Sequence, residues 1–199
     1  MDFKELNLRS VDTTANPAPL GLAGFGITTV LLNLHNAGLF ELGTMILAMG
    51  IFYGGMAQII AGIMEWKKGN TFGTTAFTSY GLFWLSLAAL LIMPKMGFGE
   101  TNSPTAMSSY LLMWGMFTFF LFLATFKMNK AIQVVFGSLT LLFLLLALGD
   151  ITGNAALKKT AGIEGIICGI SAIYAAMAQI LNEVYGKTIL PLGVPHKKN

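Results

Sequence analysis

Charge is scarce in this sequence, and its scarcity excludes a soluble domain. Only 11% of the 199 residues are Asp, Glu, Lys or Arg, whereas soluble domains carry about 25%. Six stretches of 18 to 28 residues carry no charge at all: 13–40, 42–64, 69–94, 101–126, 131–149 and 165–182. A helix needs about 20 apolar residues to cross a bilayer core. The sequence therefore predicts an all-α, polytopic membrane protein with six transmembrane helices.

The residues that an enzyme or a metal site would need are also scarce. Cys168 is the single cysteine, which excludes an intrachain disulfide, and neither His35 nor His196 belongs to a cluster with metal-ligand spacing. We find no phosphate-binding loop and no Gly-x-Ser-x-Gly motif. Glu164 is the one acid well placed to enter a span, and we assign it to the first turn of the sixth helix, where the helix dipole favours a carboxylate. We expect no enzyme, no cofactor and no metal.

No linker or charge run divides the chain, so we expect one transport domain. It covers residues 16–186, between a polar leader at 1–15 and a tail at 187–199. Runs such as SLTLLFLLLAL (138–148) do not alternate between apolar and polar residues, which argues against a transmembrane β-barrel. The six helices are expected over 17–37, 42–65, 71–93, 106–127, 130–149 and 161–185.

The basic residues predict the orientation. If the N-terminus is cytoplasmic, nine lysines and arginines lie on that side: Lys4, Arg9, Lys67, Lys68, Lys127, Lys130, Lys187, Lys197 and Lys198. The other side holds Lys95, Lys158 and Lys159. This asymmetry favours cytoplasmic termini in the cell membrane. It also explains the net charge of +3 without a nucleic-acid partner.

The first span begins with the stretch NPAPLGLAGF (16–25). Asn16 is a suitable N-cap, and Pro17 is expected at the first helical position, where its missing N–H costs nothing. These residues describe a rigid, capped helix start. The same helix terminus would favour a carboxylate if it lies at the mouth of a solute path.

Polar but uncharged side chains follow one face of the first helix. Thr28, Thr29, Asn33 and Asn36 recur at helical spacing and share this face with the apolar Phe25 and Leu32. An unsatisfied amide in hydrocarbon costs several kcal/mol (about 2–7), so Asn33 needs a partner or water. A face of aromatic, hydroxyl and amide groups is typical of a narrow path for a small amphiphilic solute.

Stripes of small residues occur on the second and sixth helices. Each includes one glutamine: Gly50, Gly54, Gln58 and Gly62 form the first, and Gly165, Gly169, Ala172, Ala176 and Gln179 form the second. Small residues at this spacing allow close helix packing in lipid. The glycines are expected to pack, and Gln58 and Gln179 either share in that packing or line a polar path.

Several motifs together resemble one family. NPAPLGL (16–22), LLNLHNAG (31–38), KKGNTFGTTAFTSYG (67–81) and GNAA (153–156) are similar to the acetate uptake transporter family, the succinate–acetate permeases of prokaryotes and their fungal relatives. The resemblance covers nearly the whole chain. It implies six helices, a homohexamer with a path in each protomer, and uptake of acetate or succinate coupled to protons.

The family resemblance also implies site residues. An apolar constriction of the family corresponds here to Phe25, Tyr80 and Leu139. We add Asn154 of the GNAA motif to the residues expected to line the path. A stripe of threonines on the third helix (Thr71, Thr75 and Thr78) cannot share a face with Tyr80 at about 100° per residue and is assigned to helix packing.

Two mechanisms remain open at the level of sequence. The acid can cross the constriction protonated, which amounts to proton symport, or Asn33, Gln58 and the Tyr80 hydroxyl can solvate the anion, as in a channel. Proton cotransport is slightly preferred because a bare buried charge is costly. A urea-like channel for neutral amides and a membrane sensor without transport are the competing function classes.

Overall fold

The computed structural model describes residues 14–193, and every regular element in this range is a helix. Most of the leader expected at 1–15 and the end of the tail expected at 187–199 lie outside these residues. The elements are α1 (Ala18–Asn36), α2 (Thr44–Met49), η1 (Gly50–Ala57), α3 (Gln58–Lys67), α4 (Thr71–Ile92), η2 (Met93–Met96), α5 (Pro104–Thr125), α6 (Lys130–Thr152) and α7 (Ala155–Val184).

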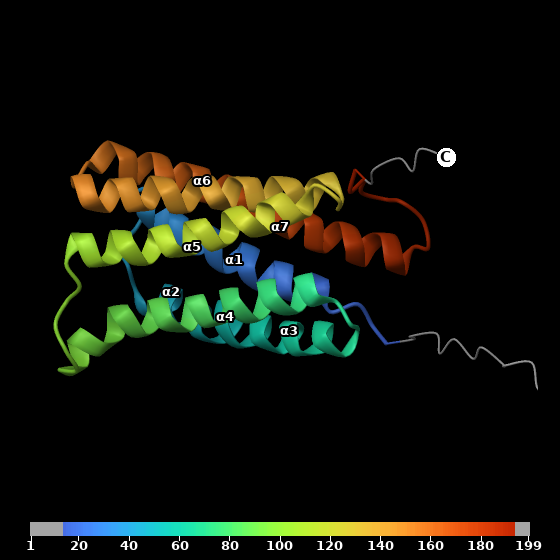
Figure 1. Cartoon of the computed structure of the whole chain (residues 1–199), viewed down its shortest axis with the longest axis horizontal. Coiled ribbons are helices and arrows are strands. Elements are labelled where there is room, and N and C mark those ends of the chain that lie inside the picture. The colour runs from blue at the N-terminus through green and yellow to red at the C-terminus, as the bar shows by residue number, and fades with distance from the viewer. Residues whose placement is uncertain (1–13, 194–199) are drawn as a thin grey trace, which may run out of the picture.

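These elements make six spans that are long and apolar enough to cross a membrane: Ala18–Asn36, Thr44–Lys67, Thr71–Met96, Pro104–Thr125, Lys130–Thr152 and Ala155–Val184. All six predicted helices are therefore confirmed. In Figure 1, α1 runs through the middle of the molecule, with α3 and α4 on one side and α5, α6 and α7 on the other. The closest packing joins α1 to α7, α5 to α6, α6 to α7 and α3 to α4.

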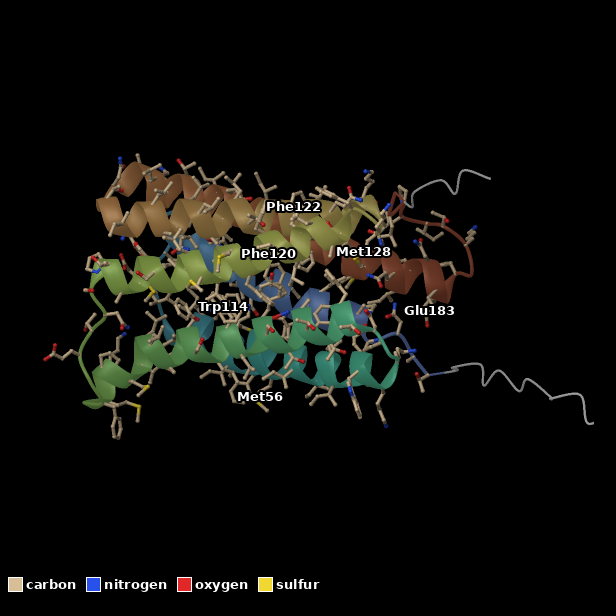
Figure 2. All side chains as sticks on the ribbon, viewed as in Figure 1. Met56, Trp114, Phe120, Phe122, Met128 and Glu183 are labelled. Atoms are coloured by element: carbon tan, nitrogen blue, oxygen red, sulfur yellow. The ribbon has the colours of Figure 1, made fainter. Side chains whose placement is uncertain are left out.

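The surface of the bundle is apolar, and polar groups are turned inward. Met56 and Phe120 are 46% and 63% exposed and lie on outward faces of the bundle (Figure 2). Asn33 and Gln58, in contrast, are only 1% exposed. Apolar side chains favour the hydrocarbon of a bilayer, where exposed polar groups find no partner. This distribution matches a protein that crosses the cell membrane six times.

Most helix boundaries lie within a few residues of the prediction, and the differences at the start of α1 and between α6 and α7 have identifiable causes. Pro17 is the cap residue and α1 begins at Ala18, one position later than expected, although Asn16 still accepts the Ala18 N–H through its Oδ1 at 3.1 Å. The gap left by the prediction between the helices at 130–149 and 161–185 is mostly helical, because α6 continues to Thr152 and α7 begins at Ala155. Gly153 has a φ of 62°, a left-handed conformation that glycine adopts without strain, and this allows the sharp turn.

The second span contains a π-helix, η1, that the pattern of apolar residues did not predict. The glycines of its predicted stripe nevertheless pack as expected: a Cβ on Gly54 would lie 2.8 Å from the Trp84 ring, and one on Gly62 would meet Thr78. The stripe on α7 packs against α1, where a Cβ on Gly169 would lie 2.7 Å from the carbonyl oxygen of Gly26. Close helix packing through small residues is thus found on both helices.

Candidate functional site: a closed constriction between two vestibules

Three residues from three different helices surround one narrow point inside the bundle. Phe25 on α1, Tyr80 on α4 and Leu139 on α6 line the same small cavity. Their exposed fractions are 6%, 3% and 3%. The cavity volume is about 20 Å³, which leaves room for about one water molecule. The bundle is therefore closed at this point.

The lining of this cavity carries no charge. Tyr80 is its one polar residue, and the others are Leu22, Phe25, Ala76, Phe77, Val135, Phe136 and Leu139. The ring centroids of Phe25 and Tyr80 are 6.1 Å apart. The Tyr80 hydroxyl donates to Thr118 Oγ1 on α5 at 2.9 Å, and Thr118 in turn donates to the carbonyl of Trp114. The hydroxyl is thus tied to α5, and the ring serves as a wall of the constriction.

A polar vestibule adjoins the constriction at the end of the bundle where the described chain begins. We call it the Asn16 vestibule; its volume is about 450 Å³, and it shares Leu22, Ala76, Phe77 and Phe136 with the constriction. Its polar lining residues are Asn16, Glu65, Lys68, Asn70, Asn129 and Gln179. The Asn16 Nδ2 donates to Gln179 Oε1 at 3.0 Å. The predicted residues Asn16 and Gln179 therefore meet at this mouth.

Glu65 is the acid in the wall of the Asn16 vestibule. It is 3% exposed and accepts a hydrogen bond from Asn70 Nδ2 at 2.7 Å. Lys68 Nζ donates to the backbone carbonyl of Thr14 at 3.0 Å. The mouth thus combines amides with one acid and one base.

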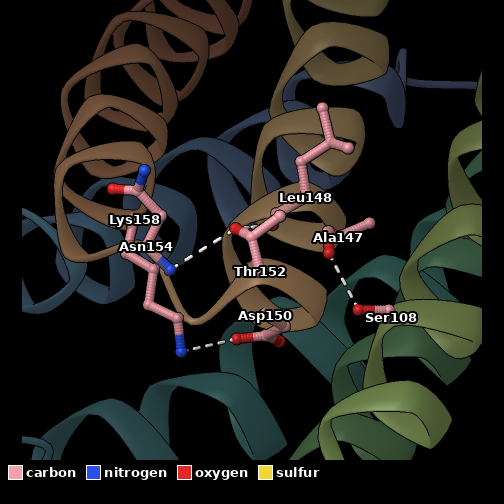
Figure 3. Close-up of polar contacts among 7 residues, drawn as sticks. All are labelled: Ser108, Ala147, Leu148, Asp150, Thr152, Asn154 and Lys158. Carbon is pink, nitrogen blue, oxygen red and sulfur yellow. Dashed lines mark hydrogen bonds and ion pairs between the residues drawn. The ribbon is translucent and has the colours of Figure 1, made fainter.

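A second vestibule lies at the opposite end of the bundle. We call it the Asp150 vestibule; its volume is about 390 Å³, and its polar lining residues are His35, Asn36, Asp150 and Lys158. Lys158 Nζ lies 2.8 Å from Asp150 Oδ1, as Figure 3 shows. The vestibule reaches inward to Phe83 and Leu146. Leu146 lies seven residues along α6 from Leu139, or about 10 Å at 1.5 Å per residue, so a short apolar layer separates this vestibule from the constriction.

Thr28, Thr29 and Asn33 of the polar face predicted on α1 are buried inside the bundle, whereas Asn36 reaches the Asp150 vestibule. Thr28 Oγ1 donates to the carbonyl of Met49 at 3.4 Å, where the π-helix begins. Asn33 Nδ2 donates to the Thr29 carbonyl of its own helix, and its Oδ1 accepts from Asn36. Gln58 packs near Gly24 of α1, and its Oε1 has no partner among the described residues. Thr28, Asn33 and Gln58 line neither the constriction nor either of the two vestibules.

Two further residues sit differently from their predicted settings. Asn154 is the N-cap of α7, and its Oδ1 accepts the N–H groups of Ala156 at 2.9 Å and Leu157 at 3.3 Å. Glu164 is not in a first turn, because α7 begins nine residues before it. The helix dipole acts within the first turn, so it does not explain this acid, whose Oε2 is buried without a partner in the described part of the chain.

The structure adds residues that the sequence had not singled out for the path. Glu65 and the Asp150–Lys158 pair line the two vestibules. The predicted helices end at 149 and begin at 161, so the placement of Asp150 and Lys158 against the dipoles of α6 and α7 becomes apparent only with the observed helix ends. Between residues 14 and 193, no group of three His, Cys, Asp or Glu side chains is arranged to hold a metal.

Comparison with known proteins agrees with this architecture. The chain is 60% identical to the succinate-acetate/proton symporter SatP of Escherichia coli K12, over 92% of this chain and 97% of that one. It is 34% identical to acetate permease A of Emericella nidulans, over 89% of this chain and 65% of that one. The solved structure of the bacterial acetate channel SatP superimposes with a TM-score of 0.90 at 60% identity, covering 90% of this chain and 99% of that chain.

A family model links these relatives to the present chain. The model of the GPR1/FUN34/yaaH family matches residues 4–192, so the match spans all six helices, the constriction and both vestibules. The family and these relatives are membrane transporters and channels, and none is an enzyme. The chain that closes a constriction with Phe25, Tyr80 and Leu139 is a member of the GPR1/FUN34/yaaH family.

Proposed function

We propose that this protein carries acetate, and succinate as a second substrate, across the cell membrane together with protons. The observation that carries the proposal is a constriction without charge between two vestibules that contain charged and amide groups. Such a path admits a small carboxylic acid at either mouth and imposes a hydrophobic filter between them. The 60% identity to a succinate-acetate/proton symporter supports the same substrates.

The charge of the substrate decides the mechanism. A carboxylate that enters an apolar constriction loses its hydration, and an unpaired charge in a low-dielectric interior is costly. Phe25 and Leu139 offer it no donor, and the Tyr80 hydroxyl already donates to Thr118. A protonated acid carries no net charge and avoids this cost. We therefore propose that the acid crosses the constriction neutral and that its proton travels with it.

The second candidate is a channel that conducts the anion without obligatory proton coupling. It is favoured by one observation: the 60% identical protein of known structure is described as an acetate channel. In that case amides would have to solvate the anion. Asn33 already binds Thr29 and Asn36, and the Gln58 atom without a partner is Oε1, an acceptor that cannot bind an anion.

Uptake of radiolabelled acetate into proteoliposomes tests the proposal. The protein is reconstituted with and without an inward proton gradient, and protein-free liposomes measure leakage of acetic acid through lipid. We expect protein-dependent acetate entry that the gradient stimulates and no entry of urea. Acetate entry at the same rate with and without the gradient would overturn the symport mechanism in favour of the channel. Urea entry without acetate entry would overturn the substrate class.

The assembly is part of the same proposal. We propose a homohexamer in which each protomer has its own path, because the constriction is built from α1, α4 and α6 of one chain. Light scattering on the detergent-solubilised protein, corrected for bound detergent, should give six times the protomer mass of 21.4 kDa. A monomeric mass with retained transport would overturn the proposed hexamer but not the proposed path within each protomer.

A further inference from the structure

The Asp150–Lys158 ion pair lies in a vestibule that a solute can enter. The two side chains are 26% and 48% exposed, so neither is sealed from water. Both line the 390 Å³ cavity whose inner end is Phe83. A carboxylate that enters this vestibule therefore meets one cation and one acid, held 2.8 Å apart (Figure 3).

Helix stability does not explain why these two charges lie here. Asp150 is in the last turn of α6, where the helix dipole is negative, and Lys158 is in the first turn of α7, where it is positive. Both side chains are thus placed against the dipole of their own helix. An exposed ion pair contributes only about 0–1 kcal/mol to stability. Stabilisation of the fold therefore accounts for little of the position of this ion pair, which lies at the mouth of the proposed path.

The surroundings fix the pair and leave it exchangeable. The turn at Gly153 and Asn154 sets α7 beside α6, and Gly149 lies against the Lys158 stem: a Cβ there would lie 2.9 Å from Lys158 Cγ. The other titratable group of the vestibule is His35 on α1, whose Nδ1 is 2.9 Å from the carbonyl oxygen of Phe40. The residues that α4 and α5 contribute to this vestibule are uncharged.

We propose that Lys158 exchanges Asp150 for the carboxylate of the substrate, and that Asp150 then protonates the bound carboxylate. This inference rests on the proposed function and supplies its missing proton donor. Asp150 first takes a proton from water on its side of the membrane, which releases Lys158 to bind the incoming carboxylate. The O–H bond of Asp150 then breaks as an O–H bond forms on the substrate. Asp150 is again a carboxylate and pairs with Lys158, while the neutral acid leaves for the constriction.

Two substitutions test the exchange in proteoliposomes. Asp150→Asn keeps the shape of the side chain but carries no transferable acidic proton, so we expect gradient-stimulated acetate uptake to fall several-fold, because the bound carboxylate would then have to enter the apolar constriction charged. Lys158→Gln should raise the KM for acetate about tenfold, the range for loss of a charge-assisted hydrogen bond, and should weaken its dependence on salt. Lys159→Gln is the matched control, because Lys159 does not line the cavity.

The outcomes separate this inference from the proposed function. If the wild-type protein admits no acetate, the proposed function falls. If the wild type shows gradient-stimulated uptake and Asp150→Asn keeps it, the exchange is overturned and acetate transport stands. Equal KM values for Lys158→Gln and Lys159→Gln would overturn it as well. Size-exclusion profiles establish that each variant is assembled, and Asp150→Glu, which retains an acid, should recover the gradient stimulation if Asp150→Asn does not assemble.

Discussion

Tyr80 combines two contacts of different kinds at the narrowest point of the path. Its ring lies 6.1 Å from Phe25 and 5.8 Å from Phe117 between centroids, and its hydroxyl donates to Thr118. In the proposed path the ring would exclude bulky or hydrated solutes, whereas the hydroxyl holds the ring against α5 through Thr118. These two contributions can be separated by substitution.

Replacing Tyr80 by Phe removes the hydroxyl and keeps the ring. The lost hydrogen bond should cost about 0.5–1.5 kcal/mol of stability, while acetate uptake and its selectivity over urea stay within a few-fold of wild type. Thermal unfolding in detergent and proteoliposome uptake measure the two effects. A complete loss of acetate uptake in an assembled Tyr80→Phe protein would instead assign the hydroxyl to the substrate.

Leu139 supplies the aliphatic wall of the constriction. Leu139→Ala removes side-chain volume beside a 20 Å³ cavity, so we expect entry of larger monocarboxylic acids that the wild type excludes. Competition of such acids with labelled acetate is the measurement. Leu141→Ala, at a position of the same helix that is 47% exposed, is the matched control and should leave selectivity unchanged. Equal selectivity of the two variants would remove Leu139 from the filter.

The constriction was predicted through resemblance, and the residues alone would not have found it. Leu139 follows the apolar period of α6 like its neighbours, so periodicity gives it no distinction from Leu142 or Leu146. Asn33 was conspicuous because a buried amide needs partners, but its partners are in its own helix. A partner within the same helix satisfies an amide as well as a water-filled path does, and sequence does not distinguish them.

Among the elements, α1 is held most closely by α7. A Cβ on Gly26 would lie 2.7 Å from the carbonyl oxygen of Gly169 and 2.8 Å from the side chain of Ile173. Because α1 carries Phe25, this contact also sets the depth of that ring in the path. Packing of α1 and geometry of the constriction are therefore coupled.

Gly26→Ala tests this contact. The added methyl group must push the two helices apart or shift Ile173, and overpacking of this kind costs about 1–3 kcal/mol. The melting temperature in detergent should fall by several degrees, and acetate uptake per assembled protein should change with it. Gly43→Ala adds the same methyl group where nothing lies within 4 Å and should change neither. A Gly26→Ala protein as stable as Gly43→Ala would show that α1 and α7 can separate freely.

The six helices were predicted well because the uncharged stretches delimit them. The π-helix within the second span and the start of α7 were not predicted. The π-helix from Gly50 to Ala57 differs from an α-helix in its hydrogen-bond pattern. Because this stretch is apolar throughout, its sequence carries no periodicity from which that pattern could be predicted. The helical start of α7 was missed because Lys158 and Lys159 lie within it. A helix of 30 residues is longer than a bilayer core of about 20 residues, so its first turns can carry charge.

At the scale of the whole molecule, the described ends of the chain lie at the same end of the bundle (Figure 1). The Lys130 N–H donates to the Gly193 carbonyl, and Lys68 lies beside Thr14. Lys158 lies at the opposite end, in the Asp150 vestibule. The structure thus divides the lysines between two ends as the charge asymmetry predicts, and that asymmetry assigns the lysine-rich end to the cytoplasm.

Single-cysteine labelling measures this orientation. A membrane-impermeant maleimide should label Glu100→Cys in intact cells and Lys187→Cys only after permeabilisation. The native Cys168 is fully buried, so the unsubstituted chain serves as the unlabelled control. The reverse pattern of labelling would place the Asp150 vestibule in the cytoplasm and would reverse the side from which Asp150 takes its proton.

The constriction, with walls from three helices of a single chain, has a genetic consequence. In the homohexamer proposed above, a variant that cannot conduct would occupy places among normal chains without blocking the paths of its neighbours. Activity in a cell that makes both forms should then fall in proportion to the fraction of the defective chain. An allele that closes the constriction would therefore lower activity only by its own share of the chains, and a dominant-negative effect would be confined to alleles that misfold and take normal partners with them.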